Sequence, residues 1–172
     1  MIFNRMDLDH LKTPNFEVRE AIEIDSEIIE NHPRCTALRD IFAVGHMYYD
    51  SHSSTLIADI SIEGIMTVPC AITLNPFDID FSTRVSEVFS FDSVDAEAED
   101  EGIIEVDGEE LDMTPYIVGA ILAEVPLKAI DPNLDEYPKG DGWIVMTEED
   151  YIKEKSQQID PRLAKLKDFK LD

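Results

Sequence analysis

The residues with the clearest chemical potential are carboxylates. The sequence has 38 Asp and Glu against 14 Lys and Arg, which gives a net charge of -24. Between Asp40 and Leu127 the only Lys or Arg is Arg84. Such a field repels nucleic-acid phosphates and anionic membranes and attracts basic proteins. The competing interpretation is a well-solvated acidic surface that has no partner.

The densest carboxylates lie in residues 92–101, DSVDAEAEDE, which have few large apolar side chains. We expect this segment to be a mobile acidic loop. Its spacing lacks the Asp-x-Asp-x-Asp-Gly pattern and closing glutamate of an EF-hand loop, so only weak cation binding is expected. The candidate partner-binding residues are carboxylates of this loop and of the strand and turn after it: Glu97, Glu99, Asp100, Glu101, Glu105, Asp107, Glu109 and Glu110.

Metal and nucleophile chemistry has little support in the sequence. Zinc needs about four nitrogen or sulfur ligands, whereas Cys35 and Cys70 are far apart and the four histidines lack ligand spacing. Arg34 and Arg39 flank Cys35, and nearby cations can lower the pKa of a thiol. No histidine-based triad context accompanies that thiol. We predict two buried, reduced cysteines, no metal, no cofactor and no catalytic residue.

The remaining totals describe a soluble protein. The 172 residues suffice for one domain with a real core, and the mean hydropathy is -0.18. No apolar run approaches the length of a membrane span. The first residues, MIFNRMDLDHLKTPN, are too polar for a signal peptide, so we predict a cytoplasmic protein without membrane contact. The last segment, 153–172, reverses the sign of the charge to +2.

Alternating apolar and polar residues predict the elements that position these groups. Half-buried antiparallel strands alternate in this way. We expect a bulge or bend at Gly64 and another at Ser86-Glu87, where the alternation slips. A short helix begins at Asp25 or Ser26. The predicted strands are 15–24, 41–49, 54–68, 77–89 and 102–106.

A broad apolar stripe predicts a packed helix over residues 112–125. Asp107-Gly108 is a turn signal, Asp112 or Thr114 can cap the helix, and Pro126 ends it. Two short helices follow, over 147–158 and 162–169. We therefore predict an α+β fold in a single domain, residues 1–172. Its sheet is mainly antiparallel, strongly bent and barrel-like, with the acidic loop 92–101 and a mildly basic tail, 153–172.

Three segments carry a family resemblance. They are ADISIEGIMTVPCAITLNPFDIDF at 58–81, IIEVDGEELDMTPYIVGAILAEVPLK at 103–128 and IDPRLAKLKDF at 159–169. In this order they resemble the bacterial YceD-type family of large ribosomal RNA subunit accumulation proteins, and the last resembles its Gram-positive branch. The resemblance implies a non-enzymatic role in accumulation of 23S ribosomal RNA, in ribosome biogenesis. Many relatives have a Cys-x-x-Cys where this chain has Cys70 and Thr73, and cysteines where residues 129–142 have none. If those cysteines bind zinc in relatives, this chain lacks the site.

Two functional hypotheses follow. In the first, the chain is an acidic binding module for a basic ribosomal protein or assembly factor. In the second, it contacts ribosomal RNA directly through the basic tail. RNA-binding proteins normally carry a basic stripe with exposed aromatic residues, whereas the densest basic residues here lie in one short tail. A small-ligand enzyme built on the sheet is a distant third, with no motif behind it.

Overall fold

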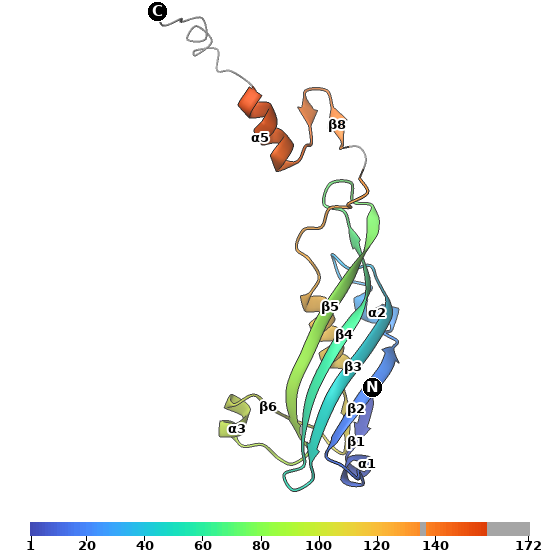
Figure 1. Cartoon of the computed structure of the whole chain (residues 1–172), viewed down its shortest axis with the longest axis vertical. Helices are drawn as coiled ribbons and strands as arrows, with labels where there is room; N and C mark the ends of the chain where they lie inside the picture. Colours follow the sequence, from blue (N-terminus) through green and yellow to red (C-terminus); the bar gives the residue numbers. More distant parts are fainter. Residues whose placement is uncertain (135–136, 158–172) are drawn as a thin grey trace, which may run out of the picture. The chain divides into compact units, whose positions relative to one another are not determined.

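The computed structural model describes residues 1–134 and 137–157 (Figure 1). The chain divides into two compact units, Met1–Ala129 and Ile130–Asp172. We predicted a single domain, and the structure divides the chain into two compact units. That the two units act as one domain stays a prediction.

A five-stranded sheet forms the centre of the first unit (Figure 1). Its order is β2-β3-β4-β5-β6. Neighbours from β2 to β5 are antiparallel, and β6 is parallel to β5. The α+β class and the mainly antiparallel sheet are thus confirmed. The described strands form an open sheet with β2 and β6 at its edges, so barrel-like closure is not observed. The strands are β2 (Asn15–Ile22), β3 (Ala37–Asp50), β4 (Thr55–Pro69), β5 (Pro76–Ser90) and β6 (Ile103–Glu105).

The inner face of this sheet buries the main core. Every second residue of β4 from Leu56 to Ile62 is buried, as the alternation predicts. Helix α4 (Thr114–Ala123) covers this face through Ile117 and Ile121, which are fully buried. The ring of Tyr116 meets that of Phe89 edge-on at a centroid distance of 4.9 Å.

Helix α4 is shorter than the predicted 112–125. Strand β7 (Glu110–Asp112) pairs antiparallel with β1 (Ile2–Asn4), which holds Asp112 in extended backbone. The carboxylate of Asp112 accepts a hydrogen bond from the backbone N–H of Thr114 at 2.9 Å. The N-cap residue is Met113, which makes no side-chain cap hydrogen bond, so the prediction that Asp112 or Thr114 is the N-cap is wrong.

The strand irregularities differ from the prediction. The register shift lies on β3 between Arg39 and Phe42, opposite Gly64, so the bulge expected at Gly64 is on the neighbouring strand. The slip expected at Ser86-Glu87 is wrong, because the register between β4 and β5 continues without interruption. Glu87 occupies an inward position, and Phe89 resumes the buried row.

Short helices complete the first unit. Helix α1 (Arg5–Asp9) follows β1, and helix α2 (Ser26–Ile29) begins where predicted, with Asp25 as its N-cap. In the second unit, β8 (Lys139–Gly140) and β9 (Trp143–Ile144) form a hairpin.

Helix α5 (Glu148–Gln157) follows this hairpin. The hydroxyl of Thr147 accepts from the Asp150 N–H at 3.1 Å and donates to its carboxylate at 2.8 Å, which is the predicted cap. The helix predicted at 162–169 lies outside the described residues, as does most of the basic tail. None of the helices in the described residues has the length and apolar character that a membrane crossing requires.

Candidate acidic interaction surface

The segment predicted as a mobile acidic loop contains a helix, α3 (Ala96–Asp100). The Asp95 carboxylate caps it by accepting from the Ala98 N–H at 2.9 Å. Acidic side chains in the first turn complement the positive end of the helix dipole. Residues 96–100 are therefore helical where a loop was predicted, because composition alone does not reveal the cap that stabilises this turn. The mobility of the segment stays a prediction.

Helix α3 and strand β6 bring the first group of predicted carboxylates together. Glu97, Glu99 and Asp100 lie on α3, and Glu101 ends it. All four are exposed, and the described part of the chain offers none of them a salt bridge. Glu105 on β6 is different, because its carboxylate accepts from the backbone N–H of Val94 at 2.8 Å. It fixes the approach to α3, so its role is structural as well as electrostatic.

The second group of carboxylates surrounds the turn between β6 and β7. Gly108 has φ of 89°, which favours glycine, and Asp107 beside it is exposed. The Glu109 carboxylate lies 3.9 Å from the guanidinium of Arg5, and the Glu110 carboxylate accepts from the side-chain amide of Asn4 at 3.3 Å. These last two carboxylates are therefore partly engaged by the N-terminal segment, whereas the four around α3 are the least compensated.

Arg5 connects the two groups. Its guanidinium donates to the Asp92 carboxylate at 2.9 Å, to the Ser54 hydroxyl at 2.8 Å and to the Phe91 carbonyl at 3.2 Å. It thereby anchors the chain where β5 ends and the approach to α3 begins. Asp92 raises the pKa of Arg5 further, so the anchor stays charged. Sequence reasoning missed Arg5 because its partners lie far along the chain and no local pattern connects them.

The remaining cations of the sheet are mostly neutralised. Arg84 pairs with Asp59, and Arg39 pairs with Asp78. The hydrogen bond from Arg84 lowers the pKa of Asp59, and those from Thr67 and Arg39 lower the pKa of Asp78. These pairs cancel locally, whereas the carboxylates around α3 have no such salt bridge within the described residues.

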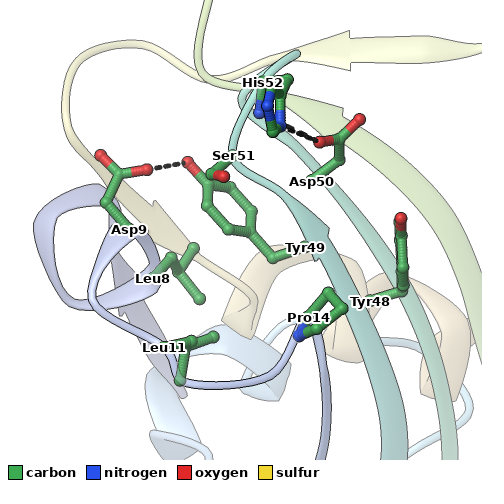
Figure 2. Close-up of a pocket in the computed structure, with 9 residues that line it drawn as sticks. All are labelled: Leu8, Asp9, Leu11, Pro14, Tyr48, Tyr49, Asp50, Ser51 and His52. Atoms are coloured by element: carbon green, nitrogen blue, oxygen red, sulfur yellow. Dashed lines mark hydrogen bonds and ion pairs between the residues drawn. The ribbon is translucent and has the colours of Figure 1, made fainter.

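A pocket of about 280 Å³ lies between the N-terminal segment and the β3–β4 turn (Figure 2). The Tyr49 hydroxyl donates to the Asp9 carboxylate at 2.8 Å, and the Asp50 carboxylate accepts from the backbone N–H of His52 at 3.0 Å. Burial, followed by the Asp9 carboxylate, raises the pKa of Tyr49 to about 12. Tyr49 with Asp9 and Asp50 with His52 thus form two separate hydrogen-bonded pairs in the lining of the pocket.

Both cysteines are buried in the core and neither forms a disulfide, as predicted. Burial raises the pKa of the Cys35 thiol, which works against the reactive thiol that its flanking arginines suggested. Over residues 1–134 and 137–157, no three His, Cys, Asp or Glu side chains form a group able to hold a metal ion.

Comparison with known proteins gives two matches. The family model "Large ribosomal RNA subunit accumulation protein YceD" matches residues 58–170. The protein YlbN of Bacillus subtilis (strain 168) is 29% identical over 163 residues, which cover 92% of this chain and 90% of that protein. No solved structure matches the chain significantly. The family match begins on β4 and includes β5, the acidic surface, α4 and α5. The chain therefore belongs to the YceD family of large ribosomal RNA subunit accumulation proteins.

Proposed function

We propose that the chain is a non-enzymatic ribosome-biogenesis factor of the cytoplasm, needed for accumulation of 23S ribosomal RNA. It acts as an acidic binding module for a basic ribosomal protein or assembly factor. The observation that carries this proposal is the group of exposed carboxylates on and beside α3, for which the described residues provide no salt bridge. Unpaired like charges repel one another, and a basic partner relieves that repulsion.

The fixed position of α3 strengthens this proposal. The Asp95 cap, the Glu105 contact to Val94 and the Arg5 anchor at Asp92 hold the acidic turn against the sheet. A preformed surface loses less conformational freedom when a partner binds than a mobile loop does. A non-enzymatic role agrees with the hydrogen-bonded pairs of the pocket at Tyr49 and with the buried thiols.

A second candidate function is direct contact with ribosomal RNA by the second unit. Trp143 is 56% exposed and Tyr151 is 48% exposed. The ammonium of Lys155 lies 5.0 Å from the centre of the Tyr151 ring, and Lys153 is on the same helix. Exposed aromatic rings beside lysines can stack on unpaired bases. This observation favours RNA more than the sequence composition does.

The test measures binding of the purified full chain to isolated large-subunit ribosomal proteins and, separately, to naked 23S ribosomal RNA, in low and high salt. We expect salt-sensitive protein binding, because exposed charges act over a Debye length of about 8 Å at physiological ionic strength. Neutralising the α3 group should weaken that binding and leave the melting temperature nearly unchanged. The variant carries Glu97→Gln, Glu99→Gln, Asp100→Asn and Glu101→Gln.

A matched control separates the α3 surface from net charge. It neutralises the same number of exposed carboxylates near β2 and α2: Glu20→Gln, Glu23→Gln, Glu27→Gln and Glu30→Gln. Partner binding should be retained in this control. A further variant, with glutamine at Lys165, Lys167 and Lys170, should also retain it. Tight binding to naked RNA that is lost with the tail lysines and untouched by the α3 change would replace the adaptor function with direct RNA binding.

A further inference from the structure

Strand β5 has a long edge that no strand of the described chain covers. On one side it pairs with β4 along its whole length, from Pro76 opposite Pro69 to Ser90 opposite Thr55. On the other side β6 pairs only with residues 88–90. Residues 76–87 therefore border no strand on that side (Figure 1). At roughly 3.3 Å per residue this open stretch is about 40 Å long.

Two backbone hydrogen bonds fix which backbone groups face outward. The Ser90 carbonyl accepts from Val106 at 2.8 Å on the β6 side, whereas the Phe91 N–H donates to Ser54 at 2.9 Å on the β4 side. Successive residues of a strand direct their backbone groups to opposite sides. Even-numbered residues therefore direct their N–H and C=O groups away from β4. The β5 edge consists of Asp78, Asp80, Ser82, Arg84 and Ser86.

The side chains at this edge select the charge of an occupant. Asp80 and Glu87 belong to β5, and Glu124 reaches it by accepting from the Thr83 hydroxyl at 3.4 Å. The guanidinium of Arg84 forms a salt bridge with Asp59 on the neighbouring strand. The edge is therefore negative, and an identical edge on a second copy would be repelled. Natural edges use charge in this way to prevent self-pairing, and the same charge attracts a strand of opposite sign.

We propose that the β5 edge binds an extended, lysine- or arginine-rich segment of a protein partner as an additional strand of the sheet. Main-chain hydrogen bonds to Ser82, Arg84 and Ser86 supply affinity, and the flanking carboxylates select basic side chains at alternate positions. The inference rests on the proposed function and deepens it, because it states how part of a basic partner is held.

The first experiment uses a peptide of alternating lysine and valine as the probe and the unmodified full chain. Hydrogen exchange should slow at the backbone amides of Ser82, Arg84 and Ser86 when the peptide is added. The amides of the opposite edge serve as an internal control. The backbone N–H of Tyr49 donates to the Pro14 carbonyl at 2.8 Å. Odd-numbered β2 residues such as Ala21 therefore direct their backbone groups away from β3. A matched glutamate–valine peptide should protect neither edge.

The second experiment removes the donors at the β5 edge. Ser82→Pro with Ser86→Pro deletes two outward N–H groups while the β4 ladder keeps its own, since proline is tolerated at such edge positions. Peptide affinity should fall at least about tenfold, because each lost hydrogen bond contributes roughly 1 kcal/mol. Ser82→Ala with Ser86→Ala keeps both donors and should bind like the natural chain. Ala21→Pro, on the opposite edge, should also bind normally.

The outcomes separate this inference from the proposed function. Peptide binding without protection of β5 amides, equal protection of both edges, or dimer formation through β5 would overturn the strand-addition mode. If ribosomal proteins bind the proline variant as tightly as the natural chain, the edge is not used, although the acidic module remains. If the peptide protects β5 while large-subunit proteins fail to bind, the edge stands and the proposed partner class is wrong.

Discussion

The substitution Gly45→Ala should destabilise the first unit by a predictable amount. Gly45 lies in the middle of β3, opposite Ile60 of β4. A Cβ at this position would lie 2.9 Å from Cγ1 of Ile60, 3.0 Å from the Asp59 carbonyl oxygen and 3.1 Å from Cγ2 of Val18. The carbonyl belongs to a central strand and has little room to move. The methyl group must therefore push side chains or strands apart.

The magnitude follows from two opposing effects. Overpacking of this kind costs about 1–3 kcal/mol. Replacing glycine by alanine also restricts the unfolded chain, which stabilises the folded state by about 0.4–1 kcal/mol. The net loss should be about 0.5–2 kcal/mol. Gly119→Ala is the matched control, because Gly119 is exposed on α4 and nothing lies within 4 Å of the added Cβ. It should stabilise the chain by up to about 1 kcal/mol.

Urea and thermal unfolding of the two variants provide the assay. For a chain of this size, 1 kcal/mol moves the melting temperature by roughly 2–4 °C. The two melting temperatures should fall on opposite sides of that of the natural chain. Equal stabilisation by both alanines would refute the close packing of β2, β3 and β4 around Gly45, and with it the register of the sheet.

The other predictions concern the core, the pH response and metal content. Ile117→Asp or Ile121→Asp should cost about 3–5 kcal/mol, because either places an unpaired charge in the core, and melting like that of the natural chain would contradict the packing of α4. The pKa of Tyr49 is raised from 10.0 to about 12 in the folded chain. The stability that its protonated hydroxyl contributes is therefore present below pH 10 and lost as pH rises toward 12. Tyr49→Phe should therefore show a smaller loss of stability over that range in urea titrations. Elemental analysis of chain purified without chelator should find well under one zinc per chain, and zinc that survives dialysis would reveal ligands other than Cys70.

The five strands of the central sheet were predictable because each carries its own signal, whereas the short strands β1, β7, β8 and β9 were not predicted. The alternation in β4 and β5 reports a sheet with one buried face, and the turn residues between them mark the hairpins. The start of α4 was placed too early because Asp112, expected to open the helix, pairs with Ile2 of β1. No local pattern reveals a partner so distant in sequence. Pairing between β1 and β7 is a tertiary effect that overrides helix propensity.

The acidic residues of the site were predictable as a group, but their separate states were not. Composition identifies the carboxylates of residues 97–110 without distinguishing Glu105, which accepts from Val94, from the unengaged side chains on α3. That distinction depends on how β6 brings residues 94 and 105 together. The edge of β5 was likewise invisible to sequence, since an unpaired side is defined only by where other strands end.

The pairing of β1 with β7 has a consequence for the order of folding during synthesis. The strands β2 to β5 pair with their neighbours in sequence, so each can pair as soon as the next has emerged from the ribosome. Strand β1, although made first, must wait for its partner, because Phe3 pairs with Leu111. In the finished fold the Met1 carbonyl accepts a hydrogen bond from the Met113 N–H at 3.0 Å, and this bond cannot form until residue 113 has been made. We expect the nascent chain to assemble its sheet first and to join its N-terminal strand last, when the segment preceding α4 arrives.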